Sequence, residues 1–204
     1  MPTSILVLRG LLVTTLAGLP LLSAAATFQF SIDTTPLNGQ SGYFAFDLYQ
    51  GDLSTSNQVV IASFSSLATL GTPTRTGGVT GTLQTSVVFN STTFFSEFLQ
   101  PLVFAAGATT FQLTTTQNYT AGNVPDSLAI FLLNNALVPF ATSDPTGANA
   151  LLAIDLGSTQ TPQLYTSTFA AVSVIPEPTG ALLFLAGLPL VVRWSSRRSR
   201  RNEG

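Results

Sequence analysis

From Thr27 onward, apolar and polar side chains alternate along the chain with a period of two. In TFQFSID, Phe28, Phe30 and Ile32 fall on one side, and Thr, Gln, Ser and Asp residues fall on the other. GYFAFDLYQ repeats the pattern, with Phe46 among its inward positions. Alternation over short runs is typical of β-strands that bury one face. We therefore expect these segments to be strands whose aromatic side chains form a core.

The same period continues to the end of the body of the chain. GGVTGTLQTSVVF, TTFQLTTTQ and QLYTSTFAAVSV alternate, whereas SLAIFLLNN and ALLAIDLGS are continuously apolar, as in strands buried on both faces. Clusters of Gly, Pro, Asn and Asp separate the runs, one of them LGTPTRTGG around Arg75. This organisation predicts an all-β fold, a single antiparallel β-sandwich of the jelly-roll or immunoglobulin-like kind over residues 27–175. A closed barrel is the alternative.

One segment departs from the period of two. STTFFSEFLQP places Phe94 four residues before Phe98, and Phe95 four residues before Leu99, which is helical spacing. A threonine could cap such a helix and Pro101 would end it. We expect a helix of one or two turns that closes an end of the sandwich; a ligand pocket lined by the phenylalanine rings is the alternative.

Composition removes several kinds of chemistry. The chain has 204 residues, of which 8% are charged, with no His and no Cys, and no Lys occurs in the sequence. Catalysis by a Ser-His-Asp triad or a Ser-Lys dyad is therefore excluded, as are thiolate metal sites. Between Thr27 and Ile175 seven acids stand against one base, a net charge of −6, which argues against binding to nucleic acid.

The body of the chain offers few marked sites, so we expect no enzyme activity, no cofactor and no metal. A catalytic carboxylate pair needs only Asp and Glu, but nothing in the sequence marks two of the acids as neighbours. Asp52, Asp126 and Asp144 could bind calcium, although solvated turn acids are the simpler interpretation. The sequons at Asn90 and Asn118 are interpreted as turns. A carbohydrate-binding module would need exposed aromatic residues, for which the body supplies Tyr43, Tyr49, Tyr119 and Tyr165.

The first 26 residues have the order of a secretory signal peptide. Arg9 precedes an uncharged apolar run over 11–22, and small residues follow at Ala24 and Ala26. A buried core helix is the alternative. Cleavage between Ala26 and Thr27 is expected, with cleavage after the preceding alanine as a second possibility. The partners implied are the secretion translocon and signal peptidase.

The last 29 residues, 176–204, have three parts. Pro176, Glu177 and Pro178 form a rigid extended spacer. An apolar stretch over 180–194 follows; as a helix it would be about 22 Å long, short of a bilayer core of about 30 Å. Basic residues end the chain over 193–201, and they are expected to stay on the cytoplasmic side of a membrane: Arg193, Arg197, Arg198, Arg200 and Arg201. A plain tail anchor would also fit these features.

The order of these parts, in IPEPTGALLFLAGLPLVVRWSSRRSRR, resembles the PEP-CTERM sorting signal of bacterial exported proteins. The resemblance implies processing by exosortase, a membrane protease-transpeptidase, and an association with extracellular polysaccharide and biofilm. Serines interrupt the arginine cluster, which is a departure from the pattern. The body is also similar to uncharacterised PEP-CTERM proteins through ATFQFSIDTTPL, FAFDL, SFSSL, FFSEFLQ and VPDSLAIFLL, a similarity that brings no activity with it.

The sequence thus predicts an exported protein that is held transiently in the inner membrane by a short C-terminal helix and is then sorted to the cell envelope, surface or extracellular matrix. A structural or adhesive role is the leading hypothesis. The alternatives are a carbohydrate-binding module of the polysaccharide matrix and a carboxylate-dependent, glycan-active enzyme.

Overall fold

The computed structural model describes residues 26–52, 56–157 and 159–175. The expected signal peptide, apart from Ala26, lies outside the described residues. So does the whole of the expected sorting signal over 176–204, with its PEP motif, apolar helix and arginine cluster. No helix in the described part of the chain is long and apolar enough to cross a membrane.

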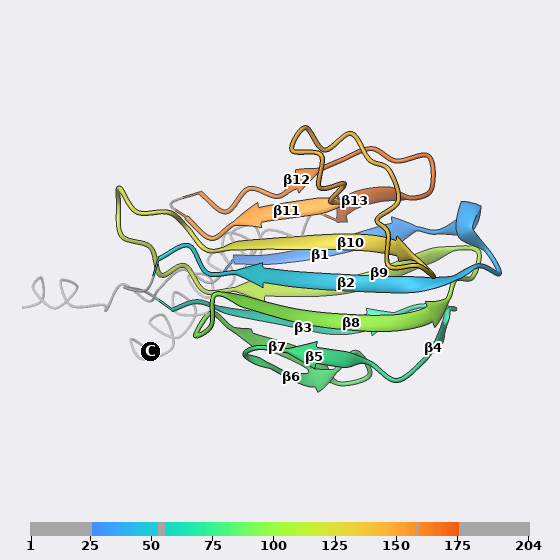
Figure 1. Cartoon of the computed structure of the whole chain (residues 1–204), viewed down its shortest axis with the longest axis horizontal. Coiled ribbons are helices and arrows are strands. Elements are labelled where there is room, and N and C mark those ends of the chain that lie inside the picture. The colour runs from blue at the N-terminus through green and yellow to red at the C-terminus, as the bar shows by residue number, and fades with distance from the viewer. Residues whose placement is uncertain (1–25, 53–55, 158, 176–204) are drawn as a thin grey trace, which may run out of the picture.

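The described chain is all-β, and its strands form two antiparallel sheets (Figure 1). The sheet that lies behind in Figure 1, called the back sheet, has the order β13 (Ala171–Ile175), β1 (Ala26–Asp33), β9 (Ala108–Thr115), β3 (Gln58–Ser65), β7 (Ser86–Asn90) and β6 (Val79–Thr82). The front sheet has the order β12 (Gln163–Leu164), β11 (Leu152–Asp155), β10 (Ser127–Asn134), β2 (Ser41–Tyr49), β8 (Phe95–Val103) and β4 (Thr69–Leu70), and β5 (Thr74–Thr76) also pairs with β8. A single 3-10 turn, η1 (Thr35–Leu37), leads from β1 into β2.

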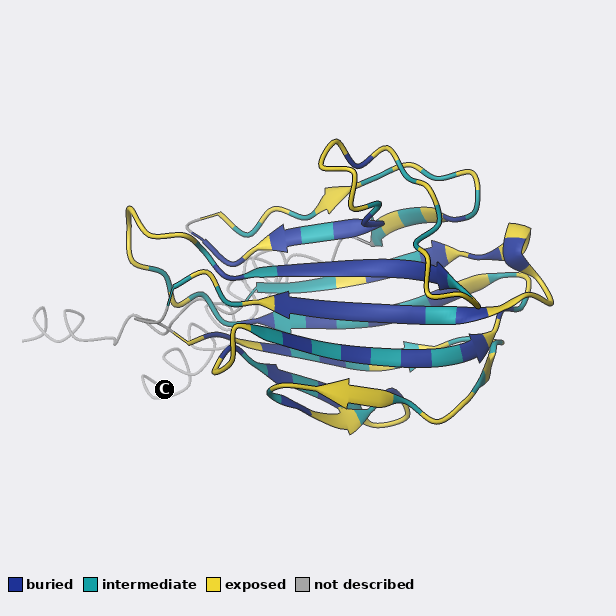
Figure 2. Ribbon diagram, viewed as in Figure 1, coloured by how far each residue is buried: buried dark blue, intermediate teal, exposed yellow. Residues whose placement is uncertain are grey.

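The two sheets face one another across one apolar core. Phe46 of the front sheet meets Phe111 of the back sheet edge to face, with ring centroids 5.7 Å apart, and both rings are buried. The predicted inward positions of the alternating runs belong to this core, including Phe30, Ile32 and Phe44. Buried positions alternate with more exposed ones along β8 and β9, while β10 is buried on both faces, as its continuous apolar run predicts (Figure 2).

The predicted helix in STTFFSEFLQP is wrong, because most of this segment is strand β8. The helical spacing of its phenylalanines coincides with a strand pattern in which Ser96, Phe98, Gln100 and Leu102 point inward. A ring-lined pocket at a capped end is therefore also wrong: Phe98 lies in the core, whereas Phe94 is 77% exposed.

Pro101 does not end the strand, because another donor makes the hydrogen bond that its missing N–H would have made. Gly71 donates its backbone N–H to the Pro101 carbonyl at 2.8 Å, and an antiparallel pair would normally return a bond from residue 101 to the Gly71 carbonyl. Proline has no N–H to give. The buried side-chain amide of Gln100 donates to the Gly71 carbonyl instead, at 2.8 Å. This substitution lets a proline occupy a strand that has neighbours on both sides.

Arg75 is exposed, as expected, but the expected turn around it is wrong, because Arg75 lies on strand β5 and pairs with Phe98. Its guanidinium lies over the Phe98 ring, 5.5 Å from the centroid, and its Nε donates to the Gly81 carbonyl at 2.8 Å. Arg75 thus links the edge of the front sheet to the β6–β7 hairpin of the back sheet.

Two alternating runs are each divided between elements. GGVTGTLQTSVVF forms the β6–β7 hairpin, in which Gly81 has a φ of +89° and an added Cβ would collide with the Ser86 carbonyl. Four apolar side chains of this run are buried: Val79, Leu83, Val87 and Phe89. QLYTSTFAAVSV supplies β12 to the front sheet and β13 to the back sheet, so the chain changes sheets between them.

Candidate functional site

The outward face of strands β2 and β8 carries side chains that a solvated sheet face does not require. Four pairs of residues lie directly opposite one another across the two strands: Tyr43 and Pro101, Ala45 and Leu99, Asp47 and Glu97, and Tyr49 and Phe95. We call these eight residues the outer strip. Since a strand rises about 3.4 Å per residue, the strip extends for about 20 Å along β2.

Two carboxyl groups, those of Asp47 and Glu97, lie side by side in this strip. Directly opposite residues of an antiparallel pair have Cβ atoms about 4.5–5.5 Å apart, and Asp47 and Glu97 are such a pair. Asp47 is only 8% exposed, and Glu97 is half-buried. Like charges in this arrangement destabilise a sheet, so the pair costs the fold free energy.

No base compensates the pair within the described residues. Arg75, the only base between Thr27 and Ile175, directs its guanidinium over the ring of Phe98, which points to the other face of β8. From β10, the residue opposite Asp47 is Ala129. The carboxyl pair is therefore bounded by apolar and neutral side chains.

Hydrogen bonding leaves Asp47 unsatisfied. The Tyr49 hydroxyl donates to Oδ2 of Asp47 over a long 3.4 Å, and Oδ1 is buried without a partner. Burial, together with the nearby carboxylate of Glu97, raises the pKa of Asp47 to about 7. Burial also raises the pKa of Glu97. Asp47 therefore needs a proton, a cation or a ligand donor at neutral pH.

Aromatic side chains stand on both sides of the carboxyl pair. Tyr49 is 38% exposed, and its ring packs against Phe95 with centroids 5.2 Å apart. Beyond Ala45 and Leu99, the half-buried ring of Tyr43 lies at the other end of the strip. Aromatic faces beside polar groups are the usual means by which a protein holds a ligand that is part apolar and part hydroxylated.

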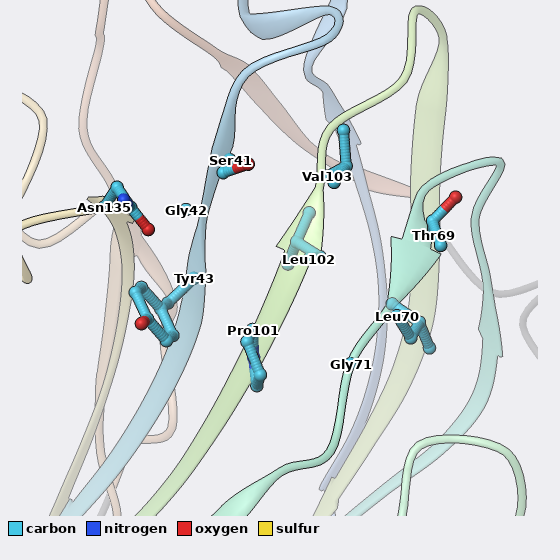
Figure 3. Close-up of a pocket in the computed structure, with 10 residues that line it drawn as sticks. All are labelled: Ser41, Gly42, Tyr43, Thr69, Leu70, Gly71, Pro101, Leu102, Val103 and Asn135. Atoms are coloured by element: carbon cyan, nitrogen blue, oxygen red, sulfur yellow. The ribbon is translucent and has the colours of Figure 1, made fainter.

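A groove continues the strip beyond Tyr43. It has a volume of about 270 Å³ and runs over the ends of β2 and β8 toward β4. Thr69 and Leu70 of β4 line it, as does Val103 at the end of β8. In Figure 3, Tyr43 and Pro101 project from the neighbouring strands β2 and β8, and both line the groove, whereas Leu70 on β4 turns away from them and packs against the core. The strip and the groove thus form one surface that runs along the front sheet.

On the β10 side, the outward face of the front sheet is closed. Ala129, Phe131 and Leu133 are each at most 9% exposed, and they cluster with Ala45 and Ala150. Tyr165 packs against this second cluster from the segment that follows β12. Because this side is covered, the accessible part of the described front-sheet face lies on the β2 and β8 side.

A second hollow of about 260 Å³ lies near the start of β10, lined by Tyr119, Pro125, Asp155 and four further residues. It contains one carboxylate and one tyrosine. The structure therefore separates Tyr119 from Tyr43 and Tyr49, which lie on β2, and from Tyr165, which packs against the outward face of the front sheet.

Of the acids considered for calcium, Asp126 and Asp144 serve the fold. Asp126 accepts from the backbone of Gly51 and from the Asn57 side chain, both at 2.9 Å. Asp144 accepts from Thr146 and Ala150 within its own turn, bonds that lower its pKa. Among the described residues there is no group of three or more acids that could hold a metal ion.

Asn57 is the centre of the network that holds these loops, and sequence reasoning missed it. It is 2% exposed; its Nδ2 donates to Asp126 and to the Asn118 carbonyl, and its Oδ1 accepts from Asn118 and Thr116. Ser91 accepts from the Asn57 backbone at 2.7 Å. Ser91 and Asn118, one residue of each sequon, thus belong to this loop network, whereas Asn90 is not in a turn but is the last residue of strand β7.

Of the residues expected to take part in processing, the structure describes Ala26 and Thr27. They begin β1, where they pair with Thr115 and Thr114. Ile175 ends β13 opposite Gln29, so the first and last described residues lie at the same end of the sheets. The PEP motif would follow Ile175 directly, outside the described residues.

The pairing of Asp47 with Glu97 could not be read from the sequence. Fifty residues separate the two acids, and only the register of β2 against β8 brings them together. No protein-family model, no curated protein and no solved structure matches the chain. The arrangement of the outer strip is therefore the main guide to function.

Proposed function

We propose that this protein is exported and sorted to the cell surface or extracellular matrix, where it binds polysaccharide without acting as an enzyme. The outer strip is the proposed binding surface, which brings the carbohydrate-binding hypothesis ahead of a purely structural role. The observation that carries the proposal is the uncompensated Asp47–Glu97 pair between the rings of Tyr49 and Tyr43.

The strip suits a chain of sugars for three reasons. Its aromatic rings can stack on the apolar faces of sugar rings, while the carboxyl groups accept hydrogen bonds from hydroxyls. It is elongated, about 20 Å by strand geometry, and the groove at Tyr43 extends it further. The half-buried carboxyl of Glu97 places an acid within reach of ligand hydroxyls between the rings.

Affinity electrophoresis of the full-length chain in mild detergent, through gels that contain bacterial exopolysaccharide, tests this binding. The wild type should be retarded, and Tyr43→Ala with Tyr49→Ala should weaken binding by at least about tenfold, the effect of losing aromatic anchors. Tyr119→Ala, outside the strip, is the matched control. Equal retardation of all three proteins would remove the strip as the binding surface.

The sorting part of the proposal rests on the tail and on the position of the chain ends. The resemblance to the PEP-CTERM signal supports recognition by an exosortase-type protease after export by the translocon. Since β1 begins at Ala26 and β13 ends at Ile175, cleavage after residue 25 and within 176–179 would leave every described strand intact. Cleavage between Ala26 and Thr27 would remove only the first residue of β1.

Intact-mass analysis of the extracellular protein tests sorting separately. The product should end near the PEP motif and lack Trp194, the only tryptophan. Replacement of Pro176, Glu177 and Pro178 by alanine should leave the full-length form in the membrane. An extracellular product that retains Trp194 and the arginines would favour a simple tail anchor.

A glycan-active enzyme is the second candidate, and the same carboxyl pair favours it. Retaining glycosidases use two carboxyl groups about 5 Å apart, one of them protonated at neutral pH. Asp47 and Glu97 are cross-strand neighbours, and the pKa of Asp47 is raised to about 7. Release of reducing ends from exopolysaccharide, lost in Glu97→Gln, would establish hydrolysis.

We infer further that the two facing sheets form a β-sandwich of the jelly-roll kind. Strands β1 to β4 alternate between the sheets, and β7 to β10 alternate again. The second run places β9 between β1 and β3 and places β8 between β2 and β4. This interleaving of two strand runs is the jelly-roll pattern, to which β10 and β13 add one strand beside β2 and β1.

A further inference from the structure

The repulsion between the two carboxyl groups of the outer strip can be reduced in three ways: by a proton shared between the groups, by a bound cation, or by hydrogen-bond donors from a ligand. Asp47 and Glu97 are held opposite one another by nine consecutive paired residues on β2 and β8. The backbone register prevents them from separating without loss of the ladder. Whatever relieves the repulsion must therefore come to the pair.

We propose that Asp47 and Glu97 hold a calcium ion on the face of the front sheet, and that this ion forms part of the polysaccharide site. This inference rests on the proposed function for the identity of the ligand, but the ion site itself rests on the described side chains. The buried Oδ1 of Asp47, 8% exposed as a residue and without a partner, provides the innermost ligand.

The donor set fits a hard cation. Every candidate ligand is an oxygen: the two carboxylates, the Tyr49 hydroxyl beside Asp47 at 3.4 Å, and Thr76, which lies opposite Glu97 on β5. Calcium takes six to eight oxygen ligands in flexible geometry, about 2.3–2.6 Å away, and commonly uses waters for some of them. Because Glu97 and Tyr49 are partly exposed, the remaining positions face solvent and are open to sugar hydroxyls.

The charge balance also favours a divalent ion. When both groups are ionised, Asp47 and Glu97 carry two negative charges with no nearby base, and one Ca²⁺ neutralises them. A site with only two carboxylates and open positions belongs to the weak class of extracellular calcium sites, with a Kd on the order of 10⁻⁴–10⁻³ M. Such an affinity would serve a protein outside the cell, where the proposal places it.

Terbium luminescence on the full-length chain, stripped with a chelator and kept in mild detergent, provides the test. Tb³⁺ in place of Ca²⁺ should be sensitised by Tyr49, and added CaCl₂ should displace it. Asp47→Asn with Glu97→Gln should lower Tb³⁺ affinity by at least about tenfold, as for a lost pair of charged ligands. Asp155→Asn, an exposed carboxylate on β11, is the matched control and should bind as the wild type does.

Thermal melting keeps the test independent of luminescence and of folding defects. CaCl₂ at millimolar concentration should raise the Tm of the wild type and of Asp155→Asn but not that of the double variant, whose melting in chelator shows that it is folded. Unchanged Tb³⁺ affinity in the folded double variant would overturn the calcium site, as would a wild type that binds no Tb³⁺. Retardation by exopolysaccharide that persists in chelator would overturn the ion's part in that site while the proposed function stands.

Discussion

The outward faces of the two sheets both meet solvent, but they present different kinds of side chain to it. Apart from Asp33 and Ala108, which lie opposite one another at the end of the two strands, the outward positions of β1 and β9 on the back sheet are neutral and polar: Thr27, Gln29, Ser31, Thr110, Gln112 and Thr114. Thr27 and Thr114 are paired across the strands, with their hydroxyl oxygens 3.3 Å apart. This face satisfies the fold at little cost, because uncharged hydroxyl and amide groups remain solvated and do not repel one another.

The corresponding face of the front sheet places rings and two acids where the back sheet has threonine and glutamine. Asp47 is buried there without a counter-charge, which lowers stability. A sheet does not need a buried acid pair on its outward face in order to fold, since the described back sheet has no such pair. Local violations of folding rules that carry a stability cost are expected at functional sites, and this difference is why we place function on the front sheet.

The largest effect should come from comparing the inner and outer faces of strand β2. Phe46→Ala should destabilise the protein by about 3–5 kcal/mol, the usual cost of removing a buried phenylalanine. Tyr49→Ala, three residues away on the outward face, should cost much less, since its side chain is 38% exposed. Urea unfolding followed by circular dichroism measures both. Equal midpoints for the two variants would mean that the faces of β2 are assigned incorrectly.

The next effect is a pH dependence that belongs to the front sheet alone. Because the folded-state pKa of Asp47 is raised to about 7 from an ordinary 3.8, the folded state holds a proton that the unfolded state releases. Stability should therefore fall as the pH rises from about 4 through about 7, by up to about 4 kcal/mol. Asp47→Asn should remove most of this slope and leave the smaller contribution of Glu97, whose pKa is raised by its own burial.

The measurement for this effect is the urea midpoint across the same pH range, in chelator, so that no divalent ion neutralises the pair. Glu97→Gln is the control that keeps Asp47 and removes its charged neighbour; the slope should shrink but persist, since burial is the larger cause of the raised pKa. A wild type whose stability is flat between these pH values would show that Asp47 is solvated.

A smaller effect should come from the loop network at the end of the sheets where the chain ends lie. Asn57→Ala removes hydrogen bonds to Asp126, Asn118 and Thr116 and takes a donor from the buried carboxylate of Asp126. We expect a loss of about 3 kcal/mol, at about 1 kcal/mol or more for each bond. The matched control is Asn38→Ala, whose side chain accepts one exposed bond, from Ala106. Similar denaturation midpoints for both variants would contradict the central role of Asn57.

The smallest effect concerns Arg75, which links the β5 edge of the front sheet to the β6–β7 hairpin of the back sheet. Arg75→Ala should cost about 1 kcal/mol, through one hydrogen-bonding group and a cation–π contact at an exposed site. Trypsin gives a second readout, because Arg75 is the only tryptic site between Thr27 and Ile175. Its place on a paired strand predicts slow cleavage of the folded protein. Rapid cleavage under native conditions would indicate that β5 detaches readily from β8.

The sequence predicted what depends on local periodicity. Phe30, Phe44 and Phe46 alternate with polar residues, and burial of one strand face follows directly from that alternation. The all-β class and the inward residues of β1, β2 and β9 could therefore be predicted. The error at STTFFSEFLQP arose because Phe94, Phe95, Phe98 and Leu99 fit helical spacing as well, and Pro101 looked like a helix end.

The candidate site depends on register, which local periodicity does not contain. Tyrosines and acids could be counted in the sequence, but only the pairing of β2 with β8 brings Glu97 beside Asp47 and Phe95 beside Tyr49. In the same way, Gln100 looked like an ordinary polar residue. Its role in replacing the N–H that Pro101 lacks becomes visible only when Gly71 lies alongside.

The central claim is that the front sheet, and not the back sheet, is the binding face. NMR chemical-shift mapping tests it most directly, with the isotope-labelled full-length chain in mild detergent and oligosaccharide fragments of bacterial exopolysaccharide as the ligand. The account predicts shifts confined to the outer strip and its groove, centred on Tyr43, Asp47, Tyr49 and Glu97, with Gln29 and Thr114 of the back sheet unmoved. Shifts centred on the back sheet, or none at saturating ligand, would contradict it.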